Sequence, residues 1–208
     1  MRPWIRVSIA GLLGAVAMFL WASIAHLATP LGSIGISQVP EGESLLAPMH
    51  ATLGETPGLY FFPRSEGQSA EAMKAYAAKL ATQPSGFILY HPPGGSSPVT
   101  HQLVAEFASE LVQSLIAAGL LAWAAIAGYW LRVGFVSLIG VAAGITTNLS
   151  YWNWYGFPTN YTVSYAGTEI AGYIAAGLVI AAVLPRNIPN GLWRVRETQI
   201  TVAIGDMG

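Results

Sequence analysis

The sequence predicts a membrane all-α bundle of four transmembrane helices, with a small α/β extracytoplasmic module between helices 1 and 2. Two observations support this fold class. Of the 208 residues, 53% are hydrophobic and only 9% are charged, whereas an ordinary soluble domain is about one quarter charged. In addition, four long apolar runs occur along the chain, each of about the length that a helix needs to cross a bilayer.

The composition also excludes several classes of function. A formal net charge of −1 provides no basic surface for nucleic acid. The absence of cysteine excludes disulfides, thiolate catalysis and cysteine-ligated metals. The chain contains no Walker sequence, no G-x-S-x-G, no H-E-x-x-H and no glycine-rich dinucleotide fingerprint. We therefore expect no cofactor and no metal, and we favour a non-enzymatic protein, with an enzyme acting on lipid as the third choice.

Residues 1–28 are predicted to form the N-terminal transmembrane helix. Residues 7–28 carry no charge, and 22 helical residues extend about 33 Å, enough for a hydrocarbon core of roughly 30 Å. The alternative is a cleaved signal peptide, with Arg2 and Arg6 before the apolar run and small residues Ser23 and Ala25 at a cleavage site. The run is longer than the apolar part of a usual signal peptide, which favours a retained helix.

Residues 29–98 are predicted to form the extracytoplasmic α/β module. The pattern indicates a helix over 41–53, a strand over 58–62, a helix over 69–82 with Ser69 as its N-cap, and a strand over 86–90. A strand, a helix and a strand joined by short links predict a right-handed crossover with parallel strands. The expected core places four strand residues against one helix face; the residues are Leu59, Phe61, Phe87 and Leu89, with Met73, Tyr76 and Leu80 facing them.

Residues 99–186 are predicted to form a three-helix transmembrane region. A helical pattern runs from Val99 to Leu131, with 111–131 as the span and Arg132 as its stop, followed at once by a third span over 133–153. These two helices are expected to form a tight antiparallel hairpin. The fourth span covers 164–184 and ends at Pro185, and residues 187–208 are assigned to a cytoplasmic tail.

The distribution of lysine and arginine predicts the orientation. Six of the nine basic residues flank the spans on one side, namely Arg2, Arg6, Arg132, Arg186, Arg194 and Arg196. The positive-inside rule places that side in the cytoplasm. The expected protein is therefore a multi-pass membrane protein with both termini in the cytoplasm.

Three short stretches carry a resemblance to a known family. They are WASIAHLATPLG at the end of the first span, PGLYFFP in the module and YWNWYGFPTNYT between the last two spans. Their order is similar to that in an uncharacterised family of small four-span bacterial inner-membrane proteins of unknown function. The resemblance implies a bacterial inner-membrane protein with four spans, and it implies no activity and no catalytic residues.

Ionisable residues within spans are candidates for function, because a charge in hydrocarbon costs at least about 2.5–3.5 kcal/mol on insertion scales. The candidate polar or cation site consists of groups expected at similar depth in the outer leaflet: His26, Glu106, Glu110, Asn148 and Glu169. The alternatives are that Glu106 and Glu110 are solvated where their helix leaves the bilayer, and that Glu169 extends toward the interface. For a buried Glu169, the expected partner is His26, Asn148 or the Glu110 face.

An aromatic-rich stretch, YWNWYGFPTNY, lies between the last two spans. It is predicted to form an interfacial aromatic belt, because amphipathic rings settle at the level of the lipid headgroups. The belt residues are Tyr151, Trp152, Trp154, Tyr155, Phe157 and Tyr161. A ligand-binding aromatic cage is the alternative.

Small residues in the spans indicate close helix packing. Gly140 and Gly144 form a G-x-x-x-G pair in the third span, a pattern that lets two helices approach closely. The pair serves either the bundle of one chain or contact with a second copy. Besides lipid and itself, the expected partner is another envelope protein.

The sequence therefore supports two functional hypotheses. The first is a non-enzymatic accessory or scaffold subunit that binds an envelope partner through its 29–98 module. The second is a small transporter or proton/cation-handling protein that uses Glu169 with His26, Glu106 or Glu110.

Overall fold

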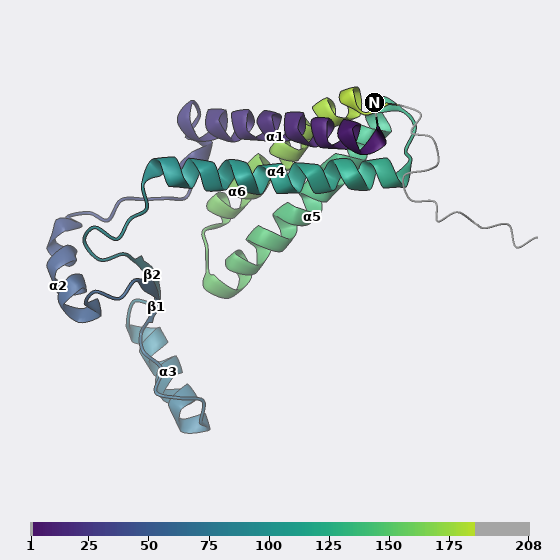
Figure 1. Ribbon diagram of the computed structural model, residues 1–208. Coiled ribbons are helices and arrows are strands. Elements are labelled where there is room, and N and C mark those ends of the chain that lie inside the picture. The colour runs from purple at the N-terminus through teal and green to yellow at the C-terminus, as the bar shows by residue number, and fades with distance from the viewer. Residues whose placement is uncertain (1, 186–208) are drawn as a thin grey trace, which may run out of the picture. The chain divides into compact units, whose positions relative to one another are not determined.

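The computed structural model describes residues 2–185; the predicted tail over 187–208 lies outside them. Figure 1 shows the elements along the chain. Their order is α1 (Pro3–Leu27), the short 3₁₀ helix η1 (Pro30–Gly32), α2 (Glu43–Leu53), β1 (Gly58–Phe62), α3 (Ala70–Thr82), β2 (Gly86–Tyr90), α4 (Val99–Ala124), α5 (Tyr129–Tyr155) and α6 (Thr159–Val183).

The described chain divides into two compact units, and each long helix contributes to both. Unit 1 contains the described residues up to Ala22, those over 107–141 and those from Ile170 onward. Unit 2 contains residues 23–106 and 142–169. Unit 2 therefore includes the whole segment over 29–98 together with one end of each long helix.

Four helices are long and apolar enough to cross a membrane. Among the described residues these are Trp4–Leu27, Val99–Ala124, Tyr129–Tyr155 and Thr159–Val183. Four apolar spans were predicted, and four such helices are present. The last two helices, α5 and α6, begin four and five residues before the predicted spans. The turn before each helix determines where the helix begins more than the start of the apolar run does.

Glycine allows the helices of unit 1 to pack closely. A Cβ at Gly11 of α1 would lie 2.6 Å from Leu115 Cδ2 of α4, and a Cβ at Gly14 would lie 2.4 Å from Ser114 Oγ. Between α5 and α6, a Cβ at Gly140 would lie 2.4 Å from Tyr173 Cβ. The helices therefore meet backbone to side chain at these points, as small residues permit in apolar bundles.

The break between α4 and α5 corrects the prediction for the second and third spans. Helix α4 ends at Ala124, and α5 begins at Tyr129, so the helix does not continue to Leu131. Ala125 has φ 51° and Gly128 has φ 85°, and this left-handed backbone cannot continue an α-helix. Arg132 is therefore not a stop signal between two spans. It lies inside α5 and is 2% exposed.

The small sheet of unit 2 corrects the predicted crossover, because β1 and β2 pair antiparallel. The register joins Gly58 to Tyr90 and Phe62 to Gly86. The seven residues over 63–69 reach about 23 Å when extended, and the 13 residues of α3 return about 20 Å. Lys79 of α3 donates to Arg64 O and contacts Glu66, both at 3.2 Å, so the two legs lie side by side. The chain leaves and re-enters the sheet at the same end, which requires antiparallel strands.

The predicted core of the module was also wrong. Residues that alternate along a strand point to opposite faces, and the register places Leu59 opposite Leu89 and Phe61 opposite Phe87 on one face. That face is uncovered, with exposed fractions of 62%, 71%, 52% and 41% in the same order. Met73 and Leu80 of α3 are exposed as well, and only Tyr76 of the expected helix face is half-buried.

On the other face of the sheet, Tyr90 connects β2 to α2. Tyr90, which is 7% exposed, donates its hydroxyl proton to Gly54 O at 2.8 Å and meets His50 Nδ1 at 2.9 Å. Because the single hydroxyl proton goes to the carbonyl, Nδ1 is the donor to Tyr90. His50 Nε2 lies 3.4 Å from Glu55 Oε1, an ion pair when the imidazole is protonated. These contacts hold α2 to β2.

This arrangement predicts a loss of stability at high pH. Burial, with nearby Glu55 and Tyr60, raises the pKa of Tyr90 above its usual value of 10.0. A phenol whose pKa is raised by folding contributes its full stability below about pH 10, and this contribution is lost as the pH rises through the folded-state pKa. Tyr90→Phe removes the titrating group and both hydrogen bonds of its hydroxyl, so the variant should be less stable than wild type at pH 8.

The stability difference between wild type and Tyr90→Phe should therefore narrow as the pH rises from 8 to 11. Thermal unfolding of both purified proteins, followed by circular dichroism, measures it. A difference that stays constant over this range would contradict the assignment of Tyr90 as the titrating group.

Candidate functional site

A hydrogen bond between α5 and α6 joins two of the predicted site residues. Asn148 Nδ2 donates to Glu169 Oε2 at 3.2 Å and to Gly144 O, one turn earlier on its own helix, at 3.0 Å. Asn148 is 8% exposed, and Glu169 is half-buried. Both amide protons of Asn148 are thus used, and one of them fixes the carboxylate of Glu169 against α5.

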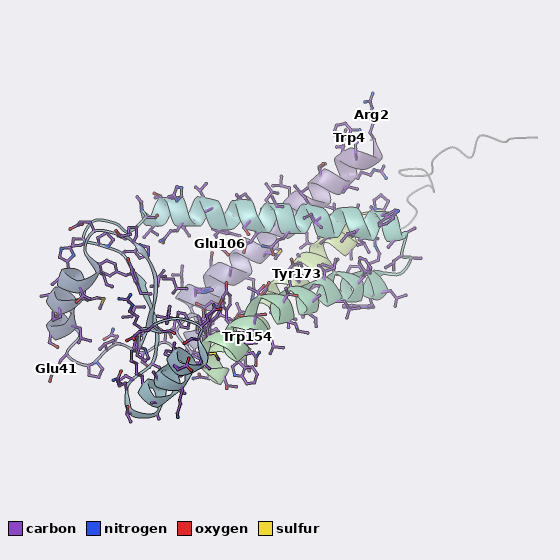
Figure 2. The ribbon with its side chains drawn as sticks, turned by 90° about the horizontal axis from the view of Figure 1, so that it is seen from below. Arg2, Trp4, Glu41, Glu106, Trp154 and Tyr173 are labelled. Carbon is purple, nitrogen blue, oxygen red and sulfur yellow. The ribbon has the colours of Figure 1, made fainter. Side chains whose placement is uncertain are left out.

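The two carboxylates of α4 have different environments. Glu106, labelled in Figure 2, is exposed in unit 2. Glu110, one turn further along α4, is 5% exposed and belongs to unit 1. The solvated alternative is therefore wrong for Glu110, because it is buried on the same face of α4 as Ser114, which lies one turn further along and is fully buried.

A second polar link joins α4 and α6, and it lies in unit 1. Tyr173, which is 4% exposed and lies among the long helices in Figure 2, donates its hydroxyl to Gln113 Oε1 at 2.9 Å. Gln113 in turn donates from Nε2 to Ser109 Oγ at 3.0 Å. Buried polar groups in an apolar bundle are hydrogen-bonded in this way because an unmade bond is costly.

His26, in the last turn of α1, lies beside an aromatic residue of α6. Its ring packs edge-on against Tyr165 with centroids 6.0 Å apart, and a Cβ at Gly32 would lie 2.7 Å from His26 Cδ2. The segment that follows α1 is bound to the same helix, since Ser164 Oγ donates to Leu31 O at 3.0 Å. His26 is thus part of the contact between η1 and α6.

Four of the six predicted belt residues, together with Phe87 and Tyr165, form a series of ring contacts. Centroid distances between successive rings are 5.0–5.7 Å, except for the stacked pair Tyr161–Tyr165 at 4.3 Å. The series runs Phe87, Tyr155, Tyr151, Phe157, Tyr161 and Tyr165. It therefore links strand β2 to the end of α5, the turn over 156–158 and the start of α6.

The two tryptophans of the belt lie outside this series. Trp154 is 78% exposed (Figure 2). Trp152 is 42% exposed, and its indole N–H donates to Thr159 Oγ1 at 3.1 Å, which holds the end of α5 to the start of α6. Both rings present large surfaces outward at the same end of α5.

Three residues that link α6 to its neighbours were not predicted from the sequence to make these contacts. Arg132 of α5 donates from Nη1 to Leu184 O at 2.9 Å and thereby joins the start of α5 to the end of α6. Tyr165 and Tyr173 also belong to this group. A helical periodicity that sets α6 residues 165, 169 and 173 on one stripe is the signal that would have found the two tyrosines.

The carboxyl group of Glu169 can take up and release a proton, and the N–H of Asn148 fixes the position of one of its oxygens. Among the described residues, no group of three or more histidine, aspartate or glutamate side chains is placed to hold a metal ion. Comparison with family models, with curated proteins and with solved structures finds no match for this chain. The family resemblance noted in the sequence stays a prediction.

Proposed function

We propose that this protein is a non-enzymatic accessory or scaffold subunit of the bacterial inner membrane that binds another envelope protein through its 29–98 module. The observation that carries the proposal is the exposed apolar stripe of α3. Met73 is 62% exposed and Leu80 is 42% exposed, and Tyr76 lies between them on the same side of the helix.

The two helices of the module support the proposal, because no residue of α2 or α3 is buried. Ser69 Oγ accepts from Ala72 N at 3.1 Å, and this N-cap fixes the start of α3 without using the residues of the stripe. Apolar anchors at positions i, i+3 and i+7 of a stable helix are the pattern that a hydrophobic groove of a partner protein recognises.

Site-specific photocrosslinking in cells tests the proposal. A photoreactive amino acid replaces Met73 or Leu80, and Lys74 on the polar side of α3 provides the matched control. Positions 73 and 80 are expected to yield the same protein adduct, identified by mass spectrometry, and position 74 is not. Met73→Asp, combined with the photoreactive residue at 80, should abolish that adduct.

Two results would contradict the proposal. Equal crosslinking from positions 73, 74 and 80 would show that the adduct reflects proximity without recognition. If neither position 73 nor position 80 yields a protein adduct, although the variants are present at normal abundance, the stripe binds no protein.

The proposed topology places both termini in the cytoplasm and the 29–98 module outside it. A topology reporter fused after Gly95 is expected to show extracytoplasmic activity, and a fusion after Ala127, in the α4–α5 turn, cytoplasmic activity. Enzymatic activity of two complementary reporters measures both. A cytoplasmic signal from the Gly95 fusion would reverse the map.

A second function, proton or cation handling, is favoured by one specific observation, the 3.2 Å hydrogen bond between Asn148 and Glu169. An ionisable group that is half-buried in an apolar helix, with a polar partner on the neighbouring helix, is a typical feature of ion pathways through membranes.

Two substitutions of Glu169 separate this function from a structural role. Glu169→Gln keeps an oxygen that accepts from Asn148 but cannot ionise, so it should remove a pH dependence of the melting temperature between pH 5 and 8. Glu169→Leu removes the acceptor and leaves a buried N–H of Asn148 without this bond, which costs about 1–3 kcal/mol at every pH. Thermal melts of the three purified proteins measure both effects, and identical pH dependence in wild type and the glutamine variant would exclude a titrating site.

A further inference from the structure

The β1–β2 sheet has one covered face and one uncovered face. Tyr90 and Tyr60 lie on the covered face, with rings 6.3 Å apart, and Tyr90 is bonded to α2. The uncovered face carries only apolar side chains, which are Leu59, Phe61, Phe87 and Leu89. A two-stranded sheet that leaves four large apolar side chains in water would be unstable, so another phase or molecule must cover this face.

The contacts of the uncovered face indicate the level at which it lies. The ring of Phe87 meets the ring of Tyr155 edge-on, with centroids 5.0 Å apart. Tyr155 is the last residue of α5, a helix long and apolar enough to cross a membrane, and Trp152 and Trp154 occupy the same end. Aromatic residues at the end of a spanning helix lie at the headgroup level of the bilayer. Because Phe87 of the uncovered face contacts Tyr155, we place this face at the same headgroup level.

We propose that the uncovered face of the β1–β2 sheet rests on the outer leaflet of the membrane, with Leu59 and Leu89 inserted at the boundary between headgroups and acyl chains. This inference rests on the proposed membrane insertion of the four long helices. The bound phase is phospholipid, and the sheet acts as an interfacial anchor that fixes the 29–98 module beside its own helices.

The size and chemistry of the face favour lipid over a protein partner. Four side chains exposed by 41–71% offer on the order of 500 Å² of apolar surface, since one large aromatic side chain buries about 150–250 Å². A stable protein interface needs about 800 Å² on each partner and a polar rim with hydrogen bonds. This face carries no polar side chain, which suits the acyl boundary of a bilayer.

The natural absence of cysteine allows a direct test on the full chain. Single-cysteine variants Leu59→Cys and Leu89→Cys are spin-labelled and reconstituted into vesicles of phosphatidylcholine and phosphatidylglycerol. Relaxation by oxygen, which concentrates in lipid, is compared with relaxation by a water-soluble nickel chelate. Glu55→Cys, near the covered face and with a side chain 78% exposed, is the solvent control. Leu138→Cys, 67% exposed on α5, is the lipid control.

The expected result is a ratio of oxygen to nickel accessibility at positions 59 and 89 that is several-fold higher than at position 55 and close to that at 138. If this ratio at positions 59 and 89 equals the ratio at position 55, while position 138 has the high ratio of a lipid-facing residue, the anchor is overturned and membrane insertion stands. Protection from both reagents would show that protein covers the face, in this purified system a second copy. A ratio at position 138 as low as that at position 55 would overturn membrane insertion, and the anchor with it.

Discussion

Replacing Gly140 by alanine is expected to destabilise the packing of α5 against α6. The new Cβ would meet Tyr173 at three atoms, with the nearest at 2.4 Å and the next at 2.7 Å. Those atoms begin the side chain and cannot move away without moving α6 or breaking the bond from Tyr173 to Gln113. Overpacking of this kind costs about 1–3 kcal/mol, or several degrees of melting temperature at about 2–4 °C per kcal/mol for a chain of this size.

Gly134→Ala provides a matched control on the same helix. A Cβ at Gly134 meets nothing within 4 Å, and alanine is favoured over glycine inside a helix by about 1 kcal/mol. The two substitutions are chemically identical, and they should change stability in opposite directions. Thermal unfolding of both variants in detergent micelles measures the difference. Equal shifts in the two variants would show that Gly140 makes no close contact with α6.

The bounds of the small elements were predictable from the sequence because local rules set them. Strands Gly58–Phe62 and Gly86–Tyr90 are short apolar runs that end at proline or begin at glycine, and both were predicted with these bounds. Helix α3 begins after Ser69, whose side chain accepts from Ala72 N as an N-cap does. These signals lie within a few residues of the feature that they specify.

The direction of the strands and the covered face depended on contacts between distant residues. The extended leg over 63–69 is held along α3 by Lys79, and nothing in the local pattern at Lys79 indicates this. Tyr90 is covered because it bonds to His50, 40 residues earlier. Because Leu59 and Tyr60 are both apolar or aromatic, alternation alone does not show which face of the strand is buried.

The end of α4 was missed for a related reason. The residues over 120–131 are almost all apolar, so their hydrophobicity continues through the turn. Gly128 was the local signal for a break, whereas Ala125 adopts φ 51° without being glycine. Arginine in such a sequence reads as the end of a span, but Arg132 is retained inside the fold by its bond to Leu184 O.

The candidate polar site was predictable in part. Depth along the helices limited the partner of Glu169 to three alternatives, and the structure gives the hydrogen bond to one of them, Asn148. The choice among them depends on how each helix is rotated about its axis, and apolar residues around the whole circumference of a span leave that rotation unspecified. The burial of Glu110 is undetermined by the sequence for the same reason.

Replacing Arg132 by methionine is expected to have a large effect on stability. The guanidinium is 2% exposed and donates to Leu184 O, at the end of α6, at 2.9 Å. The last carbonyls of a helix have no partner within the helix and carry partial negative charge, so a cation there is favourable. Methionine keeps most of the side-chain volume and removes the donor and the charge, which costs roughly 1.5–3 kcal/mol for a hydrogen bond to a charged group.

Two further variants separate the bond to Leu184 from a general effect of arginine. Arg6→Met removes an exposed arginine from α1 and should leave the melting temperature nearly unchanged. Arg132→Lys keeps a positive charge near the end of α6 and should recover part of the loss, because an ammonium group reaches the carbonyl as a single donor in place of a guanidinium fork. The melting temperatures of the three variants in detergent micelles are therefore expected in the order Arg132→Met, Arg132→Lys and Arg6→Met, from lowest to highest. A methionine variant as stable as Arg6→Met would mean that the link between α5 and α6 at this position contributes nothing, and that packing such as that of Gly140 on Tyr173 is sufficient to hold the two helices together.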